Sequence, residues 1–180
     1  WATIPDADVP VCWHSGTSPR NMLELDPDWD DATSSAFEAA RRPVSSAMVV
    51  SSFVLSRIGE RFPKLKVVFA AAGINWLSFQ LELSDHEWRS SMLMKEGMTV
   101  KPSDLFHRQC FVTTWFEKAG FTLRDFIGVD NIMWQSEFPM ETSTWPTSSD
   151  FIARNLGDLP EGERRKILVE NAAGLYGIPT

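Results

Sequence analysis

The sequence predicts an α/β fold built on a parallel sheet, and two observations carry that prediction. Short apolar runs end at abrupt turns, most clearly in residues 9–16 (Val-Pro-Val-Cys-Trp-His-Ser-Gly) and 132–139 (Ile-Met-Trp-Gln-Ser-Glu-Phe-Pro). A strand that is buried in a parallel sheet has this continuous apolar character. Helical patterns alternate with these runs in the order β-α-β-α-β-α-β-α, which implies right-handed crossovers between parallel strands. Four such units fit a small open sheet or half of an eight-stranded barrel, and periodicity alone does not choose.

Each predicted element has its own sequence signal. The strands are short runs rich in apolar and β-branched residues, at 9–14, 66–71, 110–115 and 131–134. The helices have apolar residues at helical spacing, at 43–62, from 75 to about 96, at 122–127 and at 161–175. Pro43 is a favourable first helical residue and Pro63 ends that helix. Residues 158–161 resemble a capping box for the last helix.

Two segments fall outside this pattern. Residues 15–42 are rich in Pro, Ser and Asp and predict a long irregular loop, which in a domain of this size is typically functional or disordered. Within it, the acidic stretch 26–31 lacks the glycine and the terminal glutamate of an EF-hand. We therefore interpret this stretch as a solvated lid or an interface and not as a calcium site.

Length and composition limit the class of protein. The 180 residues suffice for a single domain, 1–180, and a hydrophobic content of 43% favours a globular core over disorder. The net charge of −7 argues against nucleic acid and against anionic membranes as partners, since both require a basic surface. No apolar stretch approaches the roughly 20 residues that span a bilayer. Cys12 and Cys110 fall within predicted strands, so we expect buried, reduced thiols in a cytoplasmic protein.

The ends of the predicted strands carry the candidate chemistry. His14 and Glu137 each follow an apolar run, whereas the strand 66–71 ends only in alanines. The carboxyl ends of parallel strands open onto one rim, so we expect His14 and Glu137 to converge there. A neutral imidazole suits Zn²⁺ or a similar divalent ion. Glu137 is a candidate metal ligand or a general base for a water that a metal activates.

Structural interpretations stand beside these functional ones. His14 would serve equally as a packed core or loop histidine, and Glu137 as a carboxylate hydrogen-bonded across the rim. His86 and His107 are surface or packing residues by position. Tryptophans gather near the strand ends and the following loops, where they either pack the rim or line a pocket for a planar or apolar substrate: Trp13, Trp76, Trp115, Trp134 and Trp145.

Four stretches of sequence resemble the amidohydrolase-related family, in the branch that holds aminocarboxymuconate-semialdehyde decarboxylase and the resorcylate-type decarboxylases. They are residues 10–16, 62–76, 130–146 and 163–177. The resemblance implies the C-terminal half of a TIM-type (β/α)8 barrel, covering about strands five to eight. It also implies a divalent metal, with Zn²⁺ first and Mn²⁺ or Fe²⁺ as alternatives. The implied reaction is hydrolysis or non-oxidative decarboxylation of a small carboxylate or aromatic compound.

The resemblance assigns roles to individual residues. It implies His14 and Glu137 as metal-site and catalytic residues. The residues expected to line the substrate pocket are Trp13, Trp76, Thr114, Glu117 and Met140.

Departures from the family pattern carry as much weight as the matches. Ala71 stands where the family has a histidine or a glutamate, Glu137 where it has an aspartate, and Met140 where it has a histidine. The His-x-His pair of the family's first strand has no counterpart. A metal site needs at least three protein ligands, so we expect an N-terminal half, another subunit or a second copy to complete the barrel. The alternative is a catalytically degenerate subunit that binds a partner or ligand, which Ala71 and Met140 favour.

Overall fold

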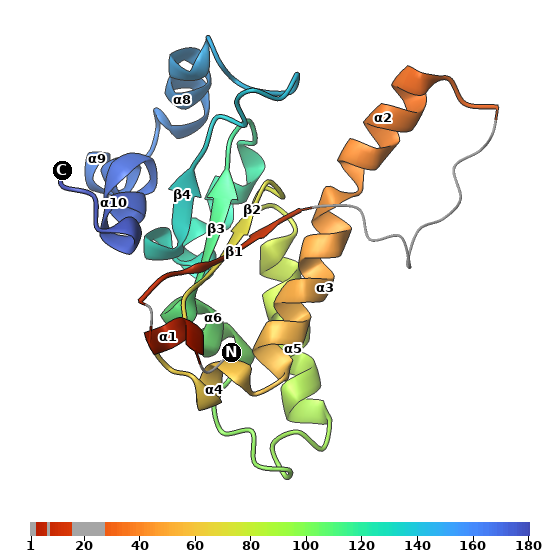
Figure 1. The fold of residues 1–180 in the computed structure, drawn as a ribbon, viewed down its shortest axis with the longest axis vertical. Coiled ribbons are helices and arrows are strands. Elements are labelled where there is room, and N and C mark those ends of the chain that lie inside the picture. Colours follow the sequence, from red (N-terminus) through yellow and green to blue (C-terminus); the bar gives the residue numbers. More distant parts are fainter. Residues whose placement is uncertain (1–2, 7, 16–27) are drawn as a thin grey trace.

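A four-stranded sheet forms the centre of the computed structural model, which describes residues 3–6, 8–15 and 28–180 (Figure 1). Its strands are β1 (Val11–His14), β2 (Val67–Ala70), β3 (Cys110–Thr114) and β4 (Ile132–Trp134). They lie in the order β1-β2-β3-β4, and each neighbouring pair is parallel. The predicted parallel α/β architecture and all four predicted strands are therefore confirmed.

Helices connect the strands and follow the last one. The α-helices are α1 (Thr3–Asp6), α2 (Asp31–Ala40), α3 (Arg42–Leu55), α4 (Ile58–Arg61), α5 (Leu77–Ser90), α6 (Pro102–Gln109), α7 (Arg124–Ile127), α8 (Ser148–Leu156), α9 (Glu161–Arg165) and α10 (Asn171–Tyr176). Short 3-10 turns cover Ala119–Leu123 and Val129–Asn131, and a π-helical turn, Lys166–Glu170, joins α9 to α10. None of the described helices is long and apolar enough to cross a membrane.

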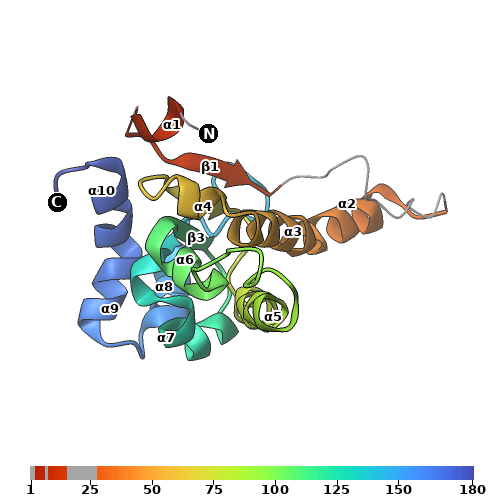
Figure 2. The same cartoon turned by 90° about the horizontal axis from the view of Figure 1, so that it is seen from below.

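The hydrophobic core lies between one face of the sheet and the helices that cover it. Figure 2 shows α3, α5 and α6 on the same side of the strands. The sheet contributes Phe69 and Val112, both fully buried, and they pack with Phe53 of α3, Leu81 of α5 and Phe106 of α6. This packing fixes the positions of β2 and β3, and with them the loops that follow those two strands.

The predicted loop at 15–42 is wrong for its second part, because residues 31–40 form α2. Asp30 caps this helix by accepting a hydrogen bond from the Thr33 amide at 2.7 Å. The carboxylates at the end of the acidic stretch thus begin a helix, a role that Asp fills well through its short oxygen-bearing side chain. Arg41 then leads directly into α3. Residues 16–27, the remainder of the predicted loop, lie outside the described residues.

Helix boundaries account for the other differences. The helix predicted at 43–62 is interrupted after Leu55, since Arg57 adopts the left-handed conformation with φ 62° and α4 begins after it. Helices α6 and α8 were not predicted. Pro102 ends the preceding segment but also starts α6 at its first turn. The capping box at 158–161 is wrong, because Pro160 precedes α9 and no side chain caps it.

Strand β1 differs from the other strands in its exposure. Cys12, Trp13 and His14 are all exposed, whereas three of the four residues of β2 are buried. The prediction of a buried thiol is therefore wrong for Cys12 and confirmed for Cys110. β1 and β4 are both edge strands of the described sheet, but the turn Lys166–Glu170 and α10 pack on β4, whereas β1 packs chiefly on β2. Strand β1 also contacts the last helix, α10, where Cys12 Sγ lies 3.3 Å from the Tyr176 hydroxyl.

Candidate functional site

The carboxyl ends of the four strands lie along one rim of the sheet. The parallel register sets His14 beside Ala70 and Thr114 beside Trp134. Glu137 follows β4 at this same end. His14 and Glu137 nevertheless belong to the two edge strands, which are three strand spacings apart, or about 14 Å along a flat sheet. A shared metal ion would therefore require the curvature of a closed barrel.

The His14 side chain is arranged as a metal ligand would be. Its Nδ1 lies 3.0 Å from the carbonyl oxygen of Ser15. Because a carbonyl can only accept, this bond favours the tautomer with its proton on Nδ1, in which the lone pair is on Nε2. Ser15 itself is tied to the end of β2, because its amide donates to Ala70 O at 3.0 Å and its hydroxyl to Ala71 O. The hydrogen bonds of Ser15 thus fix the position of an exposed imidazole whose Nε2 has no partner among the described residues.

Glu137 occupies a sharp turn after β4. Its backbone has φ 63°, in the left-handed region that non-glycine residues seldom adopt, and its side chain is buried. The Gln135 amide donates to Oε1 of the carboxylate, and the Met140 amide donates to the Glu137 carbonyl at 2.8 Å. Oε2 has no partner among the described residues. The turn therefore holds a buried carboxylate with one oxygen available to a cation or a proton.

Ala71 is a second non-glycine residue in the left-handed conformation at a strand end, with φ 62°. Its amide donates to Thr113 Oγ1 at 3.0 Å, and its carbonyl accepts from the Ser15 hydroxyl. The residue is fully buried. The backbone at this position is thus held from both neighbouring strands, although its methyl side chain offers no ligand.

Glu117 joins the loops that follow β2 and β3. Its Oε1 accepts the Ile74 amide at 2.8 Å and its Oε2 accepts the Trp115 amide at 3.1 Å. Gly73 allows this approach, because a Cβ there would lie 2.8 Å from Glu117 Oε1 and its φ is +68°. Glu117 was predicted to face substrate, and the structure shows it buried in a cavity wall with both oxygens bonded to backbone amides.

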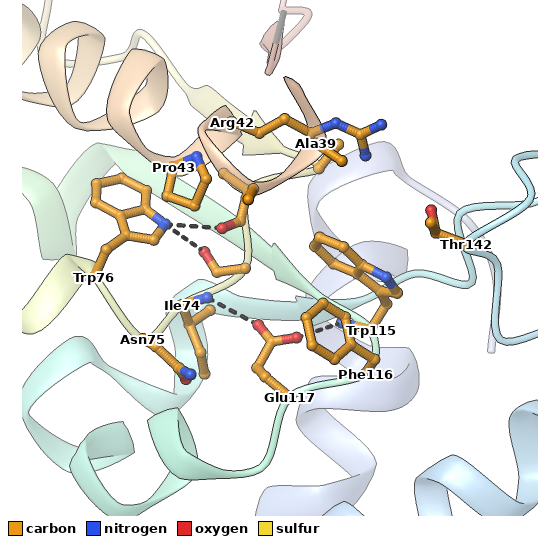
Figure 3. Close-up of a pocket in the computed structure, with 14 residues that line it drawn as sticks. Ala39, Arg42, Pro43, Ile74, Asn75, Trp76, Trp115, Phe116, Glu117 and Thr142 are labelled. Atoms are coloured by element: carbon orange, nitrogen blue, oxygen red, sulfur yellow. Dashed lines mark hydrogen bonds between the residues drawn. The ribbon is translucent and has the colours of Figure 1, made fainter. Parts of the chain in front are cut away.

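A cavity of about 470 Å³ opens beside Glu117, at the carboxyl ends of β2 and β3 (Figure 3). Its walls come from the junction of α2 and α3, the loops after β2 and β3, and the loop after β4: Ala39, Ala40, Arg42, Pro43, residues 71–76, Trp115, Phe116, Glu117 and Thr142. The Trp76 indole is fixed in this wall by donating to Ala72 O at 3.0 Å and to Gly73 O at 2.9 Å. The surface is mainly apolar and aromatic.

The predicted pocket residues divide between this cavity and the surrounding surface. Trp76 and Glu117 line the cavity. Trp13 and Met140 are 41% and 50% exposed and do not line it. Thr114 is fully buried and does not line it either, and its hydroxyl has no partner among the described residues. Sequence reasoning missed Arg42 as a wall residue, because its place depends on where α3 begins relative to the loop after β2.

The described residues do not contain three His, Cys, Asp or Glu side chains gathered as a metal-binding group. His14 Nε2 and Glu137 Oε2 are nonetheless donors of the kind that a divalent ion takes. The donor chemistry of the rim therefore fits a metal, but a complete ligand set needs at least one further donor.

The family model for amidohydrolases matches residues 1–178. A search of the curated proteins gave no match.

Solved structures resemble the chain along nearly its whole length. An amidohydrolase from Mycobacterium avium subsp. paratuberculosis K-10 has a TM-score of 0.77 at 22% identity, covering 97% of this chain and 44% of that one. The 5-carboxyvanillate decarboxylase of Sphingomonas paucimobilis gives 0.69 at 20%, covering 99% and 52%. A dihydroxybenzoic acid decarboxylase from Polaromonas sp. JS666, with bound manganese and 2-nitroresorcinol, gives 0.67 at 20%, covering 99% and 52%. At these identities the likeness establishes the fold, and the chain spans about half the length of these proteins.

Proposed function

The chain belongs to the amidohydrolase family, and from this premise we propose that its single domain, 1–180, supplies strands five to eight of a (β/α)8 barrel. The complete barrel would hydrolyse, or decarboxylate without oxidation, a small carboxylate or aromatic compound with the help of a divalent metal ion. An N-terminal half, another subunit or a second copy of the chain would supply the remaining strands.

The exposure of β1 is the observation that carries this proposal. Its residues Val-Cys-Trp-His form an apolar strand, yet Cys12, Trp13 and His14 face solvent. In a closed barrel every strand has two neighbours, and its side chains alternate between the interior and the surrounding helices. Four more strands would cover β1 and remove the free edges that proteins normally protect. The coverage of about half of each related structure supports the same arrangement.

His14 and Glu137 are the residues of this chain that would hold the metal. His14 Nε2 and Glu137 Oε2, which have no partner within the described part of the chain, support this assignment. Closure of the barrel would bring the ends of β1 and β4 around a common mouth. Zn²⁺ fits these ligands, and the manganese in the Polaromonas enzyme supports Mn²⁺ as an alternative. When bound, the ion would act as a Lewis acid that polarises a carboxylate or carbonyl oxygen of the substrate.

Proton transfer would fall to Glu137 among the residues of this rim. Ala71 stands where the family resemblance implies a histidine or a glutamate, and Met140 where it implies a histidine, so neither position has a titratable group. The Glu137 carboxylate is buried, and Gln135 orients it through one oxygen. Such a carboxylate holds or releases a proton at a fixed place beside a bound substrate.

Metal analysis of the purified protein, together with whatever completes its barrel, tests this proposal. We expect about one divalent ion per barrel, together with release of carbon dioxide from a hydroxylated benzoate such as 2,6-dihydroxybenzoate or hydrolysis of a small ester or lactone. His14→Ala should lose the metal and the activity. His86→Ala is the matched control, because His86 is exposed on α5. A protein without metal that is indifferent to His14→Ala would instead support the degenerate binding subunit.

A further inference from the structure

Helix α2 (Asp31–Ala40) has no buried residue. Figures 1 and 2 both show it projecting away from the sheet and from the helices that cover the sheet. Among the described elements it packs mainly on α3, the helix that follows it. A helix of this length is marginal in water by itself, and helices in proteins are stabilised chiefly by packing of one face. The described residues supply little such packing for α2.

One face of α2 is apolar and exposed. Thr33, Ala36 and Ala40 follow one another at steps of three or four residues, which places them on one side of the helix. Phe37 lies beside this row, and its ring packs edge to face on Trp29 with 5.1 Å between the ring centroids. We call these five residues the α2 face. The side of the helix opposite this face is polar: Asp31, Ser35 and Glu38.

The α2 face has the shape that another helix requires. Its central residues, Thr33 and Ala36, are small and exposed. Small side chains at a helix contact allow the two helix axes to approach to about 8 Å. Trp29 and Phe37 supply a larger apolar surface beside this row, and Trp29 is 38% exposed. A second helix laid along the α2 face would cover both parts.

The charges at the ends of α2 indicate which helix that is. Asp30 caps the N-terminal end and Asp31 is the first residue, whereas Arg41 and Arg42 follow the last residue. Glu38 pairs with Arg41, and Arg42 keeps this end positive. Two α2 helices packed antiparallel would place the acidic start of each beside the basic end of the other, with their helix dipoles opposed. Parallel packing would instead bring like charges together at both ends.

We propose that the α2 face is an interface between two copies of this chain, in which their α2 helices pack antiparallel about a two-fold axis. This interface is distinct from the free edge of β1, at which the proposed barrel would continue, because α2 projects away from the sheet. Ala40, at one end of the α2 face, also lines the cavity. The second copy would therefore lie beside the cavity without depending on what binds there.

Sedimentation velocity of the purified protein, together with whatever completes its barrel, tests this inference. The wild-type assembly should have twice the mass of the Ala36→Glu assembly, because the variant would bury an unpaired carboxylate from each copy. We expect the dissociation constant to rise at least about tenfold. Ser35→Glu is the matched control, since it adds the same charge on the opposite, exposed side of α2, and it should keep the wild-type mass.

Cross-linking tests the direction of the two helices and needs no disruptive variant. In a Cys12→Ala background, a short bismaleimide should join two chains that carry Ala36→Cys, because position 36 lies near the centre of the α2 face. It should not join two chains that carry Ala40→Cys, since antiparallel packing sets the two copies of position 40 about 16 Å apart along the helix axis.

Equal masses for the wild type and Ala36→Glu, or cross-linking at position 40 and not at position 36, would overturn the inference. Equal masses are also the result expected if the half that completes the barrel covers the α2 face. Ala36→Glu should keep the metal content of the wild type, because neither His14 nor Glu137 lies on α2. Failure of this inference is therefore distinguishable from failure of the proposed function.

Discussion

Strands β1 and β2 have similar apolar sequences but opposite environments. β2, with Val67, Val68 and Phe69 buried, has strand neighbours on both sides and helices over one face. β1 has one strand neighbour, and the side chains of Trp13 and His14 face solvent. An apolar run predicts that a strand forms, but its burial depends on every neighbour being in place. The exposed strand is therefore the edge at which the proposed barrel would continue.

The largest expected difference between the exposed and the buried strand is in the reactivity of their cysteine thiols. Cys12 on β1 is exposed, whereas Cys110 on β3 is fully buried, and burial raises the pKa of its thiol well above the ordinary value. The thiolate is the reactive form. We expect an aromatic disulfide reagent to label Cys12 at once and Cys110 at least about a thousandfold more slowly, through unfolding. Equal protection of both thiols would show that β1 is covered in solution.

Replacing one aromatic residue on β1 and one on β2 by alanine shows how much each strand's burial contributes to the free energy of unfolding. Phe69→Ala should lower the free energy of unfolding by about 3–5 kcal/mol, because Phe69 is fully buried in the core. Trp13→Ala should cost less than about 1 kcal/mol, since a large part of Trp13 already faces solvent. Urea unfolding followed by circular dichroism measures both. A cost for Trp13→Ala close to that for Phe69→Ala would break the comparison.

The smallest expected effect is the change in stability with pH that comes from the contact between β1 and the last helix, α10. Tyr176, the only tyrosine in the chain, has its pKa raised to about 12 by partial desolvation of its hydroxyl and by the bond with Cys12. Since the unfolded state ionises first, near pH 10, the contact stabilises the fold fully below that pH and is lost as pH rises from about 10 to 12. Ultraviolet titration of the phenolate should report this pKa, and Cys12→Ala should lower it. An ordinary tyrosine pKa would show that the contact is absent.

The sequence pattern located all four strands because each is an apolar run bounded by turns. It did not locate α2, since the prolines and aspartates before residue 31 obscured the cap at Asp30. It read Pro102 only as the end of one segment, although a proline also suits the start of the next helix. Propensity cannot show which of these two roles a proline takes.

For the site, too, sequence patterns located residues along the chain but did not show which of them meet in three dimensions. His14 and Glu137 could be placed at strand ends from spacing alone, because parallel strands share a rim. Arg42 could not be placed, since it reaches the cavity only because α3 begins beside the loop that follows β2. Trp115 was recognisable as an aromatic residue near a strand end. Its unpaired N–H depends on three-dimensional packing that no sequence pattern records.

The bent backbone at Ala71 bears on how this rim could change over time. With φ 62°, it is held from two sides by Thr113 and Ser15. Histidine is among the residues that tolerate this conformation best, so an imidazole could be introduced there without rebuilding the loop. The main chain at position 71 therefore already has a conformation in which histidine is several-fold enriched.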